Sequence, residues 1–250
     1  DKVIEITGQR KIHYLGHSQG TQLAFTLLSR RPEYNRKIHR AFLMTPVKVM
    51  HSFKGMLADL MKLYNRNGIT TQIDGLLKKH FGINIQVPGP VVVAPIIQSY
   101  CLAPNGTLLD TCQSTFDYVF GASKAKLDTS RFPFYLTQFP DTTSTVNMIH
   151  SAQLLGNQEP ARRFDFYSAE KNVAVYGTER PPLLDYTSIK IPMYIWWSAN
   201  DGLLGGAEKY EIFPTLVRRF CPGTVKKVFH VPTYNHLDFT VALDARKKIY

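Results

Sequence analysis

The segment Lys11–Arg31, KIHYLGHSQGTQLAFTLLSRR, decides what fold we expect. Its first residues, Lys11–Leu15, form a short β-type run that ends at Gly16. From Gln19 onward, leucine and alanine residues recur at helical spacing until Pro32, where a proline stops the helix. The local order is therefore a strand, a turn bounded by glycines, and a helix.

The same alternation continues elsewhere in the chain. Three further buried-type strands are expected, at Arg40–Val47, Ile191–Ser198 and Lys227–Val231. Helical patterns cover Ala207–Phe220, where Pro214 can introduce a kink, and Leu237–Tyr250. Strands that alternate with helices predict an α/β protein with a mainly parallel sheet covered on both faces.

The composition excludes several classes of protein. Of the 250 residues, 44% are hydrophobic and 20% are charged, so the chain can bury a core and is not disordered. No run of about 18 apolar residues occurs, so we expect no transmembrane segment. The net charge of +11 comes from scattered basic pairs, which argues against a nucleic-acid partner. Dispersed cations can still attract an anionic lipid surface.

The pentapeptide Gly16–Gly20, GHSQG, fits the G-x-S-x-G pattern of a nucleophile elbow between a strand and a helix. Such a turn presents the Ser18 hydroxyl at the carboxyl end of the sheet. The backbone N–H of Gln19 can then donate to the oxyanion of a tetrahedral intermediate. The alternative interpretation of Ser18 is an ordinary serine N-cap in a tight turn.

A nucleophilic serine needs a base, and the base needs an orienting acid. After a nucleophile elbow, the acid comes next along the chain and the histidine last. Asp201 directly follows the third expected strand, and His236 follows the fourth. His236 is the one histidine of eight that has both this order and a loop position. Asp238 and Asp244 are rival acids, but both come after the histidine.

The cysteines indicate a disulfide rather than a metal site. Cys101, Cys112 and Cys221 fit no zinc spacing. Cys101 and Cys112 flank the turn-forming stretch Pro104–Gly106, which suggests a local disulfide and leaves Cys221 free. Asn105 begins the only N-x-Ser/Thr sequon, a candidate glycosylation site inside the same loop. Both features point to a secretory environment, and the alternative is three reduced thiols with an unused sequon.

The chain resembles the acid lipase family of α/β-hydrolases, which includes lysosomal acid lipase, gastric lipase and insect lipase-3-like proteins. The resemblance is carried by Tyr14–Thr21 (YLGHSQGT), Asn200–Leu204 (NDGLL) and Tyr234–Phe239 (YNHLDF), and in the middle by Leu127–Arg131, Thr143-Ser144 to Asn147, His150 to Gln153, Phe164–Phe166 and Pro181-Pro182. It therefore runs across nearly the whole chain. By this resemblance the nucleophile is Ser18, the acid is Asp201 and the base is His236.

The resemblance also implies an α/β-hydrolase fold with a helical cap or lid insertion. The expected organisation is a core sheet part with the elbow at 1–48, the cap at 49–186, and a core sheet part with the acid and histidine at 187–250. Gln19 takes the oxyanion role, and the pairing of Cys101 with Cys112 is similar to the family's cap disulfide. The family has a further amino-terminal section with a His-Gly loop, so we expect this chain to be truncated at its amino terminus.

The sequence thus predicts a serine hydrolase that cleaves carboxylic esters of lipids, triacylglycerol or sterol esters, through an acyl-serine intermediate. The expected enzyme uses no metal and no cofactor, acts at a lipid–water interface, and is secreted or lysosomal. Two alternatives stay open. A soluble carboxylesterase would share the three residues, and a lipid-binding or storage relative would be expected to have lost the serine or the histidine.

Overall fold

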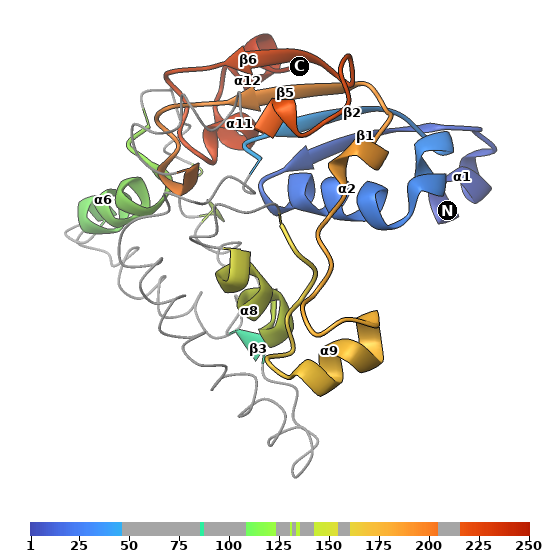
Figure 1. The fold of residues 1–250 in the computed structure, drawn as a ribbon. Coiled ribbons are helices and arrows are strands. Elements are labelled where there is room, and N and C mark those ends of the chain that lie inside the picture. Colours follow the sequence, from blue (N-terminus) through green and yellow to red (C-terminus); the bar gives the residue numbers. More distant parts are fainter. Residues whose placement is uncertain are drawn as a thin grey trace.

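A computed structural model of the protein describes residues 1–46, 86–87, 109–123, 131, 134–135, 143–154, 161–204 and 216–250. Its centre is a sheet of four strands, in the spatial order β1 (Ile12–His17), β2 (Ile38–Met44), β5 (Met193–Trp197) and β6 (Val225–His230). All three neighbouring pairs run parallel (Figure 1). The predicted parallel sheet is therefore confirmed, and each of its strands was expected from the sequence with slightly different bounds.

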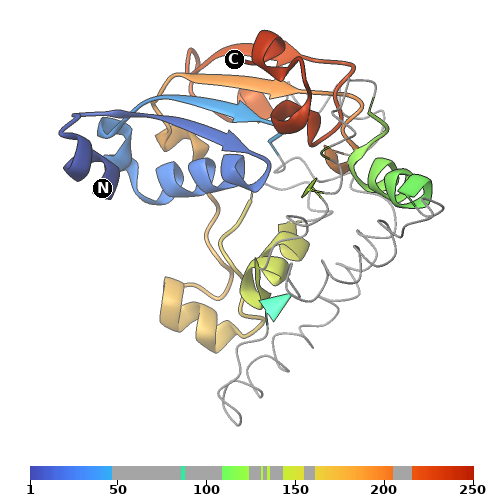
Figure 2. The ribbon, with the colours of Figure 1, turned by 180° about the vertical axis from the view of Figure 1, so that it is seen from behind.

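Helices cover both faces of this sheet (Figures 1 and 2). The helix α2 (Gln19–Arg30) lies on one face, between β1 and the 3₁₀ helix η1 (Pro32–Arg36). The opposite face carries α11 (Asp238–Val241) and α12 (Ala245–Lys248). A single helix over 237–250 was expected, and this expectation was wrong. The backbone at Ala242 is extended rather than helical, and this break lets Ala242 and Ala245 both pack into the core.

The remaining described elements lie outside the sheet. They are α1 (Lys2–Thr7), β3 (Gln86–Val87), α6 (Leu109–Phe120), β4 (Thr143–Ser144), α8 (Thr145–Leu154), α9 (Ala169–Tyr176), η5 (Tyr186–Ser188) and η6 (Gly202–Leu204). Figure 2 shows α6 beyond the carboxyl ends of the strands, with α8 and α9 away from the sheet on the α2 side. Within the described ranges, no helix is both long and apolar enough to cross a bilayer.

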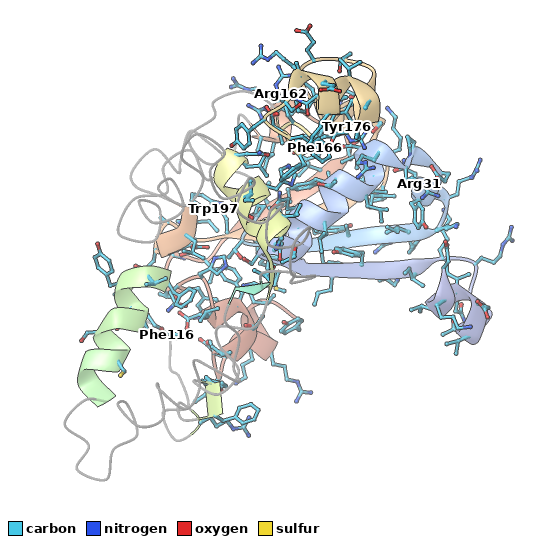
Figure 3. The ribbon with its side chains drawn as sticks, turned by 90° about the horizontal axis from the view of Figure 1, so that it is seen from below. Arg31, Phe116, Arg162, Phe166, Tyr176 and Trp197 are labelled. Atoms are coloured by element: carbon cyan, nitrogen blue, oxygen red, sulfur yellow. The ribbon has the colours of Figure 1, made fainter. Side chains whose placement is uncertain are left out.

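The segment around α9 packs through aromatic rings. Phe166 and Tyr176 lie side by side, with ring centroids 5.9 Å apart (Figure 3). Tyr176 also donates a hydrogen bond of 2.9 Å to the backbone oxygen of Phe164. Of the expected helix 207–220, only residues 216–220 are among those described, and there Leu216 and Phe220 are buried.

The core is divided by the sheet into two layers, as the two-residue period of a strand requires. On β5, Met193, Ile195 and Trp197 face the α2 layer, whereas Tyr194 and Trp196 face the α11 and α12 layer. The central strand β5 is thus covered on both sides, whereas the edge strands β1 and β6 keep exposed side chains such as Leu15 and Val228. Because neighbouring strands run parallel, the loops that follow β1, β5 and β6 all leave the sheet at the same edge.

The α2 layer depends on Phe25, which is fully buried and contacts Tyr186 and Phe220 at ring centroid distances of 5.5 and 5.3 Å. We expect Phe25→Ala to lower the free energy of unfolding by about 3–5 kcal/mol, because it leaves a cavity in a packed layer. The matched control on the same helix is Leu23→Ala. Leu23 is 60% exposed, so this change should cost no more than about 0.5 kcal/mol. Equal losses for both variants in urea denaturation would contradict the core assignment.

Candidate active site

The turn after β1 holds Ser18 in a backbone conformation that residues other than glycine rarely adopt, with φ 53° and ψ −120°. Two contacts fix it there. The Ser18 N–H donates to the backbone oxygen of Met44 at 3.0 Å, and the backbone oxygen of Ser18 accepts from the Thr21 hydroxyl at 2.7 Å. Strain of this kind costs about 1–3 kcal/mol and persists only where the surroundings impose it. The sheet and α2 therefore aim the Ser18 side chain.

The glycines of the elbow permit a close approach between strand and helix. A Cβ atom on Gly16 would lie 2.8 Å from the Tyr14 ring and 2.9 Å from the Gly20 backbone, too near for any side chain. The Tyr14 hydroxyl closes the turn by donating to the Gly20 oxygen at 2.6 Å. A residue other than glycine at position 16 would therefore push the start of α2 away from β1.

The structure brings the three predicted residues together. The Ser18 Oγ lies 2.7 Å from Nε2 of His236, and Nδ1 of His236 lies 2.8 Å from Oδ2 of Asp201. The carboxylate accepts from Nδ1–H, which leaves Nε2 to accept from the Ser18 hydroxyl. Asp201 is fully buried, His236 is 2% exposed, and the second carboxylate oxygen accepts from the N–H of Leu203 at 2.8 Å.

Ser18 occupies the N-cap position of α2, but its side chain makes no capping hydrogen bond. Its hydroxyl is instead directed at the imidazole of His236. The ordinary N-cap interpretation therefore does not describe this serine. Gln19 is the first residue of α2. Because the first N–H groups of a helix have no partner within the helix, the N–H of Gln19 is suited to donate to an anionic oxygen.

The loop that carries His236 is tied to the end of α6, more than a hundred residues earlier in the chain. The His236 N–H donates to the Phe120 oxygen at 3.0 Å, and the side-chain amide of Asn235 donates to the Gly121 oxygen at 3.0 Å. In Figure 3, Phe116 lies on the side of α6 that faces the rest of the protein. Its ring packs on that of Phe120, with centroids 4.6 Å apart.

The contact between the end of α6 and the His236 loop requires glycine at position 121, where φ is 96°. A Cβ atom there would lie 1.9 Å from the backbone oxygen of Asn200, the residue before the acid. The Asn200 side chain donates in turn to the Ala122 oxygen. The end of α6 thus touches both the loop of Asp201 and the loop of His236.

Asp238, a rival acid by sequence, bonds to the loop backbone and a serine hydroxyl, whereas Nδ1 of His236 bonds to Asp201. The Oδ2 of Asp238 accepts from the Asn235 N–H at 2.7 Å and from the Ser123 hydroxyl at 2.8 Å, while Asn235 Oδ1 accepts from the N–H groups of Leu237 and Asp238. This reciprocal pair shapes the loop around His236. The sequence reasoning gave it no role, although an Asn and an Asp three residues apart in a loop, N-x-x-D, is the spacing at which such side chains bond nearby backbone.

Burial raises the pKa of Asp238, and the negative charges of Asp117 and Asp244 act in the same direction. The hydrogen bonds from Asn235 and Ser123 oppose this shift. Its Oδ1 is buried and has no hydrogen-bond partner among the described residues. Asp244 behaves oppositely, because hydrogen bonds from Lys248 and Tyr234 lower its pKa.

The helix α8 also contacts the elbow. The side-chain amide of Gln19 donates to Oδ1 of Asn147 on α8 at 2.7 Å, and Asn147 donates in turn to the Thr143 hydroxyl at 2.7 Å. Asn147 was noted in the sequence only as part of the resemblance. The contact places α8 directly beside the residue predicted to bind the oxyanion.

The cysteine predictions are tested only in part. Cys112 is disulfide-bonded, and Cys221 is in no disulfide. Cys101 and the sequon residue Asn105 lie outside the described residues, so the pairing with Cys101 and the glycosylation of Asn105 stay predictions. Among the residues that are described, no group of three or more His, Cys, Asp or Glu is placed to hold a metal ion.

The sheet, the elbow and the order of the three site residues define an α/β-hydrolase. A profile of the alpha/beta hydrolase fold matches residues 1–67. Lipase lipl-5 of Caenorhabditis elegans is 31% identical over 99% of this chain and 59% of its own length. Gastric triacylglycerol lipase of Mus musculus is 30% identical over 100% of this chain and 59% of its own. Lipase member K of Homo sapiens is 30% identical over 99% and 58%.

The chain is thus similar to lipases over nearly its whole length, and its sheet and elbow have the arrangement of the α/β-hydrolase fold. It spans 59% of the length of lipl-5 and of the mouse gastric lipase.

The carboxyl of Asp238 gives a prediction about pH. Because its pKa is raised in the folded protein, the fold favours the protonated form, and the wild type loses stability as pH rises above the ordinary range of an aspartate, about 4. Asp238→Asn cannot ionise, so its melting temperature relative to wild type should increase between about pH 4 and pH 7. Thermal unfolding monitored by circular dichroism across this range measures the trend.

Asp244→Asn is the matched control, and its trend should have the opposite sign. The lowered pKa of Asp244 means that its ionised form stabilises the fold, and this contribution is present above the ordinary aspartate range. When the scan is extended below pH 4, its melting temperature relative to wild type should therefore decrease as pH rises toward about 4, and it should stay level from there to pH 7. The same trend in both variants would contradict the assignment.

Proposed function

We propose that the protein is a serine hydrolase that cleaves carboxylic esters of lipids through an acyl-serine intermediate. The observation that carries this proposal is the continuous chain of hydrogen bonds from Ser18 through His236 to Asp201, at 2.7 and 2.8 Å. Nucleophile, base and orienting acid are within reach of one another without any movement. The expected roles of these residues rest on this geometry.

In the acylation step, His236 takes the proton of the Ser18 hydroxyl at Nε2 while Oγ attacks the ester carbonyl carbon. The carbonyl oxygen becomes an oxyanion, which the N–H of Gln19 stabilises. The C–O bond to the alcohol then breaks, and His236 returns the proton to the leaving alcohol. The buried carboxylate of Asp201 stabilises the imidazolium that exists between these two transfers.

Deacylation uses the same groups with water in place of the alcohol. His236 removes a proton from a water molecule, the resulting hydroxide attacks the acyl carbon, and Ser18 leaves with the proton returned by His236. The products are the free acid and the regenerated hydroxyl. These steps need no metal or organic cofactor.

The proposed substrates are triacylglycerols or sterol esters, met at a lipid–water interface. Support comes from relatives named as lipases, including a gastric triacylglycerol lipase. We further propose that residues 49–186 form a cap between the core parts 1–48 and 187–250, and that the protein is secreted or lysosomal. The contact of α8 with Gln19 supports a cap that reaches the nucleophile.

Ser18→Ala should lower kcat for p-nitrophenyl butyrate by at least about 10⁴-fold, because losing a triad member typically costs that much or more. The measurement uses the full-length protein. Ser29→Ala is the matched control on the same helix, since the Ser29 hydroxyl is buried and makes no hydrogen bond in the described structure. It should keep wild-type activity. Less than a tenfold loss for Ser18→Ala would remove the catalytic assignment.

The substrate class is tested separately with tributyrin below and above its solubility limit. A lipase should show a sharp rise in rate once emulsion droplets form, because its substrate is the lipid surface. A soluble carboxylesterase would instead reach saturation with dissolved substrate and gain nothing from the droplets. Binding of emulsion with no turnover by the wild type would favour a lipid-binding or storage protein.

A further inference from the structure

His17, the residue before the nucleophile, makes a contact that the proposed mechanism does not use. Its Nε2 lies 2.7 Å from the backbone oxygen of His236, and the two imidazole rings are 5.0 Å apart between centroids. A carbonyl oxygen can only accept, so Nε2 of His17 carries the proton and donates. The contact joins positions 219 residues apart in the sequence.

This hydrogen bond completes the support of the His236 backbone. The N–H of His236 is bound by the Phe120 oxygen at 3.0 Å, and its carbonyl oxygen is bound by His17. The peptide group before His236 is bound by Phe120 at the end of α6, and the peptide group after it is bound by His17 on β1. The same strand β1 leads into the elbow. Any shift of the His236 loop away from Ser18 has to break one of these two bonds.

We propose that His17 is a positioning residue, which binds the carbonyl of His236 and so keeps the base within hydrogen-bonding distance of Ser18. The proposal rests on the proposed function, because it assigns His17 a role in the same reaction. His17 does not touch the reacting atoms. It acts through the backbone of His236, and a displacement of about 1 Å at a catalytic group can lower the rate by about 100-fold.

The charge of His17 matters for this role. Burial, together with the nearby His236, lowers the pKa of His17 from 6.5 to about 4, although the hydrogen bond to the His236 carbonyl and the charge of Asp201 oppose this shift. His17 is therefore uncharged while His236 passes through its imidazolium form. A second positive ring 5.0 Å away would repel that cation and slow the reaction.

The titration also affects folding. In the unfolded chain the histidine takes up a proton below about pH 6.5, whereas in the folded protein it does so only near pH 4. The folded state thus loses stability relative to the unfolded state as pH falls through this window.

The test compares two substitutions of His17 in the full-length protein, with p-nitrophenyl butyrate as substrate. His17→Gln keeps an N–H donor that can reach the carbonyl and cannot be charged, whereas His17→Leu has similar bulk and no donor. At pH 7 we expect His17→Leu to lower kcat by about 10- to 100-fold with KM changed by less than about twofold. His17→Gln should stay within about threefold of wild type.

Acid pH separates positioning from mere packing. As pH falls from 6 to 4, kcat of His17→Gln relative to wild type should rise, because only the wild type gains a charge beside His236. Its melting temperature relative to wild type should rise over the same interval. His13→Leu, at an exposed histidine on the same strand, is the control and should keep the wild-type kcat across this interval.

A folded His17→Leu protein with wild-type kcat would overturn the proposal, as would His17→Gln being no better than His17→Leu. A constant activity ratio between pH 6 and pH 4 would overturn the role assigned to charge. If His17→Leu does not fold, the His17→Gln profile alone decides. Failure of the proposed function looks different, because the activity would then persist in Ser18→Ala whatever stands at position 17.

Discussion

The site depends on a buried carboxylate that must remain paired. Asp201 is fully buried, and its two oxygens accept from the imidazole of His236 and the N–H of Leu203. An ionised group removed from water is tolerated only when hydrogen bonds and an opposite or polarisable partner replace its hydration. Breaking one side of a buried pair costs about 3–5 kcal/mol, which is a large share of a typical domain's stability. The position of His236 is therefore fixed by stability as well as by chemistry.

The strained elbow is the second fixed part of the same arrangement. Ser18 and Thr45 both have positive φ angles at the carboxyl ends of the adjacent strands β1 and β2. The cost of this strain is offset by the two packed layers of the sheet and by the hydrogen bond from Ser18 to Met44. The end of α6 then joins the two loops, through Gly121 against Asn200 and Phe120 against His236. The end of a helix outside the sheet thus helps to define the distance between base and nucleophile.

Much of this could be predicted from the sequence, because the deciding signals are local. The GHSQG turn between a strand and a helix identifies Ser18, and the order of loops along parallel strands identifies Asp201 and His236. The long-range partners could not be found in this way. Nothing in the spacing of Phe120, Gly121 and Ser123 shows that they meet the loop around His236, since that contact depends on how α6 packs.

Two further differences have physical causes. The expected helix at the carboxyl terminus is two short helices, because packing of Ala242 and Ala245 against the sheet outweighs helical continuity. Asp238 looked like a rival acid, since a sequence shows that a carboxylate is present but not which neighbour it bonds. Its bonds go to Asn235 and Ser123 rather than to the imidazole.

The most direct measurement is to find which side chain a fluorophosphonate modifies, since this reagent reacts only with a serine activated by a nearby base. Trypsin cleaves after Lys11 and Arg30, so Ser18 and Ser29 fall in one peptide that fragmentation by mass spectrometry can resolve. We predict a single adduct on Ser18, which disappears when His236 is replaced by glutamine. An adduct on another residue, or an unmodified Ser18 in the folded wild-type protein, would contradict the account.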